Sequence, residues 1–336
     1  MKQILITGAY GFVGSNLARD LIDYNLMAVD LKESVGTAYS AFFSWDNLEL
    51  VPWPEISVII HLAGKAHDTK KQTAIGEYFA VNTDLTKKIF KYFLQSDATK
   101  FIYFSSVKAA ADKVDGVLIE DVTPSPLGPY GESKLAAEKY LLEEYGRYES
   151  LREYNSETEG IGDEVIHFHR PDLNFKQLYI LRPCMIHGPN NKGNLTSLVK
   201  MVKKGIPYPL GAFENNRSYT TIDNLSFVVN ELVKRNIPSG IYNMADDNPV
   251  STNDLVKIIA EASGQREKIW KINQKVINIL AAAGSFMHLP FNKETLQKLT
   301  ENYIVSNEKL EKALGISQMP VNAIDGLRKT LESMSG

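Results

Sequence analysis

Tyr130 and Lys134 lie four positions apart in the run Tyr-Gly-Glu-Ser-Lys, where apolar spacing predicts a helix over residues 131–145. Residues four apart share one helix face, so we expect the phenol and the ammonium to be neighbours. A nearby ammonium lowers the pKa of a phenol from about 10 toward the range of a general base. Ser106 follows the apolar run Phe101–Phe104 and is expected at a sheet's carboxyl edge, where it can hydrogen-bond a reacting oxygen. This set can exchange a hydroxyl proton while hydride leaves the same carbon.

A glycine-rich turn follows the first predicted strand, residues 2–7. Gly8, Gly11 and Gly14 have G-x-x-G-x-x-G spacing, and residues 12–24 then place apolar side chains at helical spacing. The first two glycines permit a tight turn and close approach of backbone amides to a pyrophosphate, while Gly14 lets the helix pack against the strand. The helix N-terminus supplies an anion site. The predicted dinucleotide contacts of this turn are Gly8, Tyr10, Gly11, Phe12, Val13 and Gly14.

Asp30 stands where the adenosine ribose of a dinucleotide is expected. It ends the second predicted strand, residues 26–30, about 20 residues beyond the first glycine. A carboxylate there favours NAD, whereas Lys32 keeps NADP as the less favoured alternative. Small residues after the third strand let a loop pass close to the cofactor, and His61 before them is expected to be structural. The further cofactor-binding candidates are Asp46, Leu62, Ala63, Gly64 and Ser105, with Tyr130 and Lys134.

Short apolar runs alternate with longer amphipathic stretches from residue 1 to about residue 183. This alternation is typical of strand-helix units and a parallel sheet. We therefore predict an α/β fold, a Rossmann-like doubly wound parallel sheet with a smaller, mainly helical C-terminal substrate domain. The predicted strands are 2–7, 26–30, 57–62, 100–104 and 177–181, with helices over 12–24, 75–96 and 131–145.

Two domains are expected, because 336 residues exceed what one core usually holds. The predicted NAD-binding domain covers 1–185, with part of 218–250 returning to it, and the substrate domain covers 186–217 and 251–336. Residues 146–176, rich in Glu, Arg, Asn and Gly, predict a mobile insertion. Beyond residue 183 the chain is loop-rich, with predicted helices near 223–235, 251–263, 306–314 and 321–333 and a strand at 240–243.

Composition argues against several kinds of partner and site. The 37 Lys and Arg residues against 40 Asp and Glu give a net charge of -3 without long runs of either sign, so nucleic acid is not an expected partner. His167 and His169 have no third ligand, so no metal is expected. Cys184 is the single cysteine, and no signal-peptide pattern is visible at the N-terminus. These features predict a cytoplasmic location.

The most apolar stretch runs from Val276 to Pro290. It is too short to cross a bilayer of roughly 30 Å, so no membrane span is expected. We interpret it as a packing helix. A membrane-surface anchor is the alternative, because Lys275 precedes the stretch and Phe286 and Met287 lie within it.

Together these motifs resemble the extended short-chain dehydrogenase/reductase superfamily, especially the NAD-dependent epimerase/dehydratase family and its nucleotide-sugar branch. The resemblance covers nearly the whole chain. It implies that Ser106, Tyr130 and Lys134 are catalytic and that the glycine turn with its acidic partner binds NAD. It further implies that Asn82, in the run Ala-Val-Asn-Thr, lies near the nicotinamide and belongs to the cofactor-binding set.

The region after the last predicted strand resembles the substrate side of that family. The segment Arg182–Pro189 is similar to the family's turn into its substrate domain. Asn194 resembles an asparagine that contacts the diphosphate or sugar, and Arg217 resembles a diphosphate-binding arginine, whose planar fork suits phosphate. A surface ion pair is the alternative for Arg217. The substrate-binding candidates are Lys65, Ser106, Lys108, Asn194 and Arg217.

Two departures from the family pattern limit the reactions and the mode of substrate binding that the sequence predicts. Nucleotide-sugar 4,6-dehydratases usually carry Asp-Glu directly after the catalytic hydroxyl, whereas Val-Lys follows Ser106, which disfavours a dehydratase. Many UDP-sugar epimerases have another phosphate-binding arginine late in the chain. Residues 291–305 offer only Lys293 and Lys298, so diphosphate binding is expected to be arranged differently.

The resemblance implies chemistry at C4 of a nucleotide sugar. We expect an NAD-dependent 4-epimerase for a UDP-hexose or UDP-N-acetylhexosamine, working in surface-polysaccharide synthesis. A 4-keto-6-deoxy nucleotide-sugar 4-reductase is the alternative, and a steroid or flavonol ketone is a further substrate whose pocket would lack Arg217. A catalytically silent NAD-sensing or binding protein is the alternative of another class, although such proteins typically lose the catalytic tyrosine or lysine. The resemblance also implies a homodimer formed by helices around 83–95 and 133–145.

Overall fold

The computed structural model describes residues 2–34, 38–66, 74–158, 175–189, 191, 194–287, 289 and 291–334, without the side chains of 153–158 and Asn194. The chain forms two compact units. Unit 1 comprises Met1–Asp112, Thr123–Arg182 and Val229–Tyr242, and unit 2 comprises Lys113–Val122, Pro183–Val228 and Asn243–Gly336. These units are defined by the contacts within each, so the functional domain limits proposed from the sequence remain a prediction.

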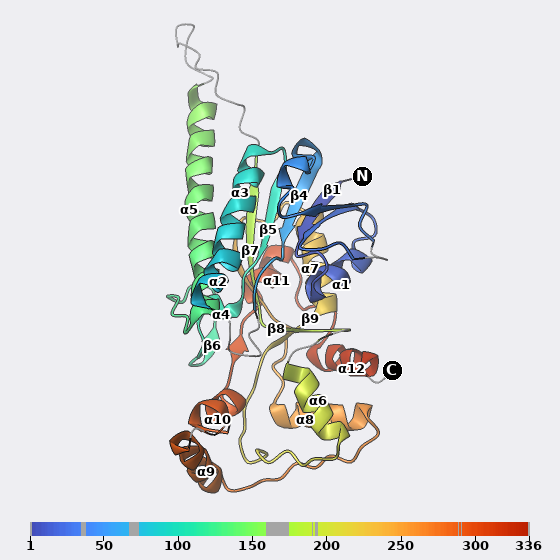
Figure 1. Cartoon of the computed structure of the whole chain (residues 1–336), viewed down its shortest axis with the longest axis vertical. Helices are drawn as coiled ribbons and strands as arrows, with labels where there is room; N and C mark the ends of the chain where they lie inside the picture. The colour runs from blue at the N-terminus through green and yellow to red at the C-terminus, as the bar shows by residue number, and fades with distance from the viewer. Residues whose placement is uncertain are drawn as a thin grey trace. The chain divides into compact units, whose positions relative to one another are not determined.

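The centre of unit 1 is a seven-stranded sheet (Figure 1). Its strands are β1 (Gln3–Thr7), β2 (Asn25–Asp30), β3 (Ala41–Ser44), β4 (Ile56–His61), β5 (Lys100–Phe104), β7 (Gln177–Pro183) and β10 (Gly240–Met244). They are arranged in the order β10-β7-β5-β4-β1-β2-β3, and the pairs from β3 through β7 are parallel. The strand order reverses between β1 and β4, the switch point at which doubly wound sheets bind ligands. The predicted Rossmann-like α/β fold is confirmed.

Helices cover both faces of this sheet. Phe90 and Phe93 lie fully buried in one hydrophobic cluster with Phe101 of β5, so α3 packs on one face. The alternate strand residues, such as Ile4 and Ile60, are also fully buried, as expected for a sheet covered on both sides. The elements of unit 1 outside the sheet are α1 (Phe12–Asp20), α2 (Ile75–Phe79), a π-helical turn (Ala80–Asp84), α3 (Leu85–Gln95), α4 (Val107–Ala110), α5 (Pro129–Thr158) and the end of α7 (Ile222–Lys234).

A buried ion pair joins α5 to the sheet. Arg182, near the end of β7, donates from Nε and Nη2 to the two carboxylate oxygens of Glu138 at 2.9 and 2.6 Å. The hydroxyl of Ser105, directly after β5, donates to the same carboxylate. Both charged side chains are at most 2% exposed. Because a buried charge is costly without its partner, this network fixes one position of α5 against β5 and β7.

Unit 2 is mainly helical. Its helices are α6 (Asn194–Lys203), α8 (Thr252–Ala262), α9 (Gln274–Phe286), α10 (Lys293–Thr300), α11 (Glu308–Leu314) and α12 (Ala323–Ser333), and its short parallel pairs are β8 (Met185–His187) with β9 (Tyr219–Thr221) and β6 (Val117–Leu118) with β11 (Ile304–Val305). Leu195 of α6, Ile259 of α8 and Leu327 of α12 share one buried cluster. Within the described residues, no helix combines the length and apolarity needed to cross a bilayer.

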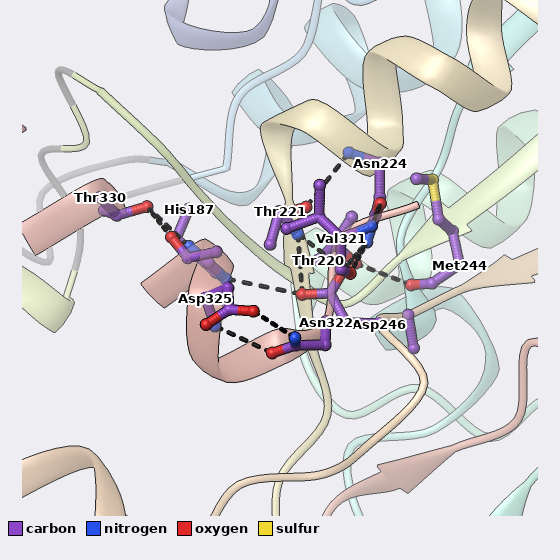
Figure 2. Close-up of polar contacts among 12 residues, drawn as sticks. His187, Thr220, Thr221, Asn224, Met244, Asp246, Val321, Asn322, Asp325 and Thr330 are labelled. Carbon is purple, nitrogen blue, oxygen red and sulfur yellow. Dashed lines mark hydrogen bonds and ion pairs between the residues drawn. The ribbon is translucent and has the colours of Figure 1, made fainter. Parts of the chain in front are cut away.

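A buried polar cluster holds the first half of α7 in unit 2 (Figure 2). The carboxylate of Asp246 accepts the backbone N–H of Thr221 at 3.0 Å and the side-chain amide of Asn224 at 2.7 Å. Asn224 also exchanges hydrogen bonds with the backbone of Val321, at 2.7 and 2.9 Å. The Nε2 atom of His187 lies 3.7 Å from Asp246. These contacts tie the end of β9, the start of α7 and the segment before α12 to one carboxylate.

The sequence predicted most strands of unit 1 to within one or two residues. The exception is β3, whose four residues Ala-Phe-Phe-Ser are all half-buried and lack the alternation that identifies a strand. In unit 2 the sequence also missed α6 and α10. The buried residues Leu195, Val199 and Val202 of α6 have helical spacing, so that signal was present in the sequence.

The prediction for residues 146–176 was wrong at its start. Helix α5 continues to Thr158, whereas the sequence ended the helix at residue 145. The ion pairs Arg147–Glu143 and Arg152–Glu149 have helical spacing on its polar side. Buried Tyr148 continues the apolar side, so that signal was present in the sequence. Residues 159–174, with His167 and His169, lie outside the described residues.

We expect Glu138→Gln to lower the free energy of unfolding by about 3 kcal/mol, because it leaves the Arg182 charge buried without a counter-charge. Urea denaturation followed by circular dichroism measures this change. The matched control is Glu143→Gln on the same helix, whose exposed pair with Arg147 contributes less than about 0.5 kcal/mol. Equal losses in the two variants would contradict the role given to the buried pair.

Candidate active site

The glycine turn between β1 and α1 has no room for side chains. Gly8 has φ 68, and a Cβ there would lie 2.8 Å from the backbone nitrogen of Ala63. A Cβ on Gly14 would lie 2.3 Å from the carbonyl oxygen of Ala9. Gly11 is the N-cap of α1 and no side chain caps that helix, so its first amides are available to an anion. This cradle fits the pyrophosphate of a dinucleotide.

The carboxylate of Asp30 lies beside the glycine turn. It accepts the backbone N–H of Tyr10 at 2.9 Å and that of Leu31 at 2.7 Å, at the end of β2. Tyr39 was missed in the sequence and supports the same turn, because its hydroxyl lies 3.0 Å from the carbonyl oxygens of both Ala9 and Gly14. Its ring meets that of Tyr10 edge-on, with 5.6 Å between the centroids. No spacing rule in the sequence indicated this contact.

Asn82 holds the loop that follows β4. It lies in the π-helical turn between α2 and α3, fully buried. Its side-chain oxygen accepts the backbone N–H of Lys65 at 2.7 Å, and its amide donates to Lys65 O at 3.1 Å and to the Ser133 hydroxyl at 2.9 Å. The widened turn of a π-helix often marks a functional position. Asn82 thereby links the loop 62–65 to α5.

Lys134 lies at the junction of β5, α5 and this loop. Its Nζ donates to the carbonyl oxygen of Phe104 at 2.7 Å. A Cβ on Gly64 would lie 3.0 Å from the same Nζ and 3.1 Å from Oδ1 of Asn82, so a side chain there would crowd both groups. Burial lowers the pKa of Lys134 to about 8, although the charge of Glu138 opposes this shift.

Tyr130 and Ser106 approach each other from the starts of α5 and α4. Burial raises the pKa of Tyr130, and a side-chain hydrogen bond with Ser106 opposes that shift. Loss of solvent outweighs this contact. The lowering of the phenol's pKa expected from the nearby ammonium stays a prediction. Ser106 caps α4 by accepting the backbone N–H of Lys108 at 3.2 Å.

His61 is fully buried at the end of β4 and has the structural role expected from the sequence. Its Nδ1 lies 2.6 Å from the hydroxyl of Thr7, and its Nε2 lies 2.9 Å from that of Thr86. Burial lowers the pKa of His61 to about 3, with a smaller effect from the charge of Lys134. The ring is therefore neutral at physiological pH.

The other candidates of unit 1 lie in its loops and in the first turns of α1 and α4. Lys65 pairs with Glu77, and Lys108 lies 3.1 Å from the carboxylate of Asp112. Asp46 is exposed in the turn after β3. Leu62 and Ala63 precede Gly64 in the loop that Asn82 holds. Phe12 and Val13 form the first turn of α1.

Two substrate candidates belong to unit 2. Asn194 is the first residue of α6, and its side chain is not among those that the structure describes. Arg217 exchanges backbone hydrogen bonds with Val250, and its Nη2 lies 4.0 Å from Glu301, a loose pair. A pocket of about 360 Å³ in the same unit is lined by Phe213, Asn278, Lys293, Leu296, Gln297 and Thr300. Lys293 is thus one late-chain cation that faces a cavity.

Lys134 links stability to pH. Its pKa is about 8 in the folded chain and near 10.5 when unfolded, so the unfolded state binds more protons in between and the free energy of unfolding rises with pH. We expect Lys134→Met to reduce this rise by about 1 kcal/mol per pH unit between about pH 8 and about pH 10. Lys100 and Lys176, whose pKa values burial also lowers to about 8, keep part of the slope.

Urea denaturation across that pH range measures the slope. The control is Lys139→Met, which removes an exposed lysine from the same helix and should leave the slope unchanged. An unaltered slope in Lys134→Met would exclude the buried ammonium as its source.

Comparison with known proteins identifies the family to which the chain belongs. The chain is 29% identical over 279 residues to UDP-glucose 4-epimerase from Vibrio cholerae, covering 78% of this chain and 76% of that protein. It is 24% identical over 338 residues, 96% of this chain and 88% of the relative, to N-acetyl-alpha-D-glucosaminyl-diphospho-ditrans,octacis-undecaprenol 4-epimerase from Escherichia coli O157:H7.

The solved structure of UDP-glucuronic acid 4-epimerase from Bacillus cereus in complex with NAD has the same fold, with a TM-score of 0.68 at 21% identity over 99% of this chain and 98% of that one. The profile of the NAD dependent epimerase/dehydratase family matches residues 4–245, well over half of the chain. The resemblance found in the sequence is thereby confirmed, and this protein belongs to the NAD dependent epimerase/dehydratase family.

Proposed function

We propose that this enzyme inverts C4 of a nucleotide sugar, most simply a UDP-hexose or UDP-N-acetylhexosamine, with Tyr130 as the group that exchanges the O4 proton. The observation that carries the proposal is the hydrogen bond between Tyr130 and Ser106, with Lys134 of the same helix bound to the carbonyl oxygen of Phe104 beside Gly64. The family membership and the 4-epimerases among the relatives support the same reaction.

The glycine turn and Asp30 are the proposed binding site for NAD. The amides at the start of α1 suit the pyrophosphate, and the carboxylate of Asp30 suits a ribose with a free 2′-hydroxyl, which favours NAD over NADP. Asp46, Leu62, Ala63, Gly64, Asn82 and Ser105 complete the proposed cofactor contacts. When bound, NAD supplies a hydride acceptor for C4 and a positive ring that lowers the pKa of Tyr130.

The chain's own groups have separate roles in this proposal. Tyr130 takes the proton from O4 as the 4-keto sugar forms. After the keto sugar has rotated in the site, Tyr130 returns the proton to O4. Ser106 hydrogen-bonds the same oxygen and holds it beside the phenol. Lys134, anchored on the carbonyl oxygen of Phe104, supplies positive charge from within the protein while the phenol is ionised.

We assign binding of the substrate diphosphate to cationic side chains other than Lys134. Arg217 pairs loosely with Glu301 at 4.0 Å, and its planar fork suits phosphate oxygens. Lys293 faces the 360 Å³ pocket and is the candidate to replace the late arginine of other epimerases. Asn194, Lys65 and Lys108 remain proposed substrate contacts, and the latter two would exchange their present carboxylate partners for substrate.

A second candidate substrate carries the sugar on a lipid diphosphate. The Escherichia coli relative named for such a substrate matches 96% of this chain, and the exposed apolar residues of α9 would suit work at a lipid surface. The chemistry at C4 would be unchanged, because only the group beyond the diphosphate differs.

Finer features of the assignment are proposals as well. A homodimer through helices near 83–95 and 133–145 is supported by exposed apolar residues of α5, Leu142 and Leu151. A cytoplasmic location and a role in surface-polysaccharide synthesis suit an enzyme of activated sugars with one buried free cysteine, Cys184. Light scattering that finds a monomer at micromolar concentration would reject the dimer.

The substrate test uses purified enzyme with UDP-GlcNAc, UDP-glucose, GlcNAc-diphospho-undecaprenol and a 4-keto-6-deoxy UDP-sugar, each with and without added NADH. We expect the three sugars that carry a C4 hydroxyl to form their C4 epimers without added NADH. Chromatography separates the epimers, and mass spectrometry confirms that their mass is unchanged. NADH consumption only with the keto sugar would replace epimerase by reductase. Inactivity with every sugar would reject the proposed substrate class.

We expect Tyr130→Phe to lower the turnover number at least about 100-fold, because proton transfer to and from O4 is lost. The bound dinucleotide, released by denaturation and measured by absorbance, should remain near the wild-type amount. Tyr140→Phe removes a hydroxyl from the same helix, further from the cluster, and should retain activity. Turnover by Tyr130→Phe at the wild-type rate would remove Tyr130 from the mechanism.

A further inference from the structure

Helix α9 presents large apolar side chains to solvent. Val276, Ile279, Leu280, Phe286 and Met287 are between 48% and 87% exposed, and we call these five residues the α9 face. Their spacing repeats every three to four residues with one interruption, so they form a stripe along the helix. A soluble helix normally turns such a stripe inward, so its exposure indicates a surface made to contact an apolar phase.

The opposite side of α9 holds the helix on unit 2. Ile277, Ala281 and Gly284 are buried, and Ile277 and Ala281 belong to the core cluster of that unit. A Cβ on Gly284 would lie 1.9 Å from the carbonyl oxygen of Phe291, so the segment leading to α10 packs directly against α9, beside which α10 lies (Figure 1). The packing therefore uses the small residues and leaves the large ones outside. The sequence-based interpretation as a packing helix was right for only this narrow side.

The segment of the chain that contains α9 carries excess positive charge. Between Gln265 and Thr300 the chain has six Lys or Arg residues and two Glu residues, a local charge of +4 in a chain whose net charge is -3. Lys271 and Lys275 are exposed next to the start of α9, and Lys293 is exposed after its end. Trp270, 57% exposed, stands beside Lys271. Exposed tryptophan and lysine residues next to an apolar helix in the sequence match the chemistry of an anionic lipid headgroup layer.

We propose that the α9 face docks this enzyme reversibly on the surface of an anionic phospholipid bilayer. The stripe enters the boundary between headgroups and acyl chains, while Lys271 and Lys275 meet lipid phosphates. A second copy of the chain is the less suitable occupant, because the local charge of +4 on each copy would face the same charge on the other. The 13 residues of α9 lie in the plane of the surface and do not span it. This docking stands independently of the sugar on which the enzyme acts.

The test is sedimentation of the full chain with vesicles of phosphatidylcholine, with and without phosphatidylglycerol. We expect binding to the anionic vesicles that weakens as salt rises. Ile279→Gln combined with Phe286→Gln should lower the partition coefficient on the order of 10-fold or more, since both apolar side chains leave the lipid. Lys271→Gln combined with Lys275→Gln should reduce binding to anionic vesicles and remove much of its salt dependence.

The matched control replaces two exposed apolar residues of unit 1, Ile22→Gln with Leu50→Gln, which are 74% and 65% exposed. It should bind vesicles like the wild type. Circular dichroism melting of each variant checks that the fold is kept, and C4 epimerisation of a water-soluble nucleotide sugar should be equal in all of them. Absence of vesicle binding by the wild type, equal binding by the α9 variant, or an α9 variant that only converts a dimer to a monomer in light scattering would overturn the proposal.

Discussion

The contact on which the catalytic region depends is the buried pair between Arg182 and Glu138. It joins the end of β7 to α5, and the hydroxyl of Ser105 extends it to β5. Lys134 lies one helical turn before Glu138, and Ser106 is the residue after Ser105. The carboxylate of Glu138, which has no proposed role in the reaction, thus holds α5 against the end of β5. These two elements position the proposed acid-base groups. Its charge also partly offsets the loss of solvent around Lys134.

Close backbone approach is the second constraint. Gly8 permits contact between the first turn and Ala63, and Gly64 leaves space for Lys134 and Asn82. Burial in this region favours neutral forms, since it raises the pKa of Tyr130 and lowers that of Lys134. The proposed role of Tyr130 as a base therefore depends on positive charge from the bound cofactor, which would lower the pKa of the phenol.

The sequence predicted the doubly wound sheet because buried parallel strands and amphipathic helices have strong, distinct periods. It also predicted the glycine turn and the position of Asp30 beside it, because both follow from local geometry. The pairing of Tyr130 with Lys134 stays a prediction. It could not identify Tyr39, which reaches the turn from a separate segment, or the Arg182–Glu138 pair, since both depend on tertiary contact. Burial of Tyr130 cannot be read from residue spacing either, so its effect on the pKa of the phenol was not predicted. The helix beyond residue 145 was missed although Tyr148 continues, at helical spacing, the side of the helix that Leu141 and Tyr145 pack against the core.

The central claim is that hydride leaves C4 and returns to the same carbon inside one site. The most direct test is the reaction of UDP-GlcNAc or UDP-glucose in D₂O, followed by proton NMR of the C4 position. The account predicts the C4 epimer with its original hydrogen retained at C4, because only the O4 proton exchanges with Tyr130 and solvent. Deuterium at C4 of the epimer, or removal of the hydrogen from a neighbouring carbon, would contradict it.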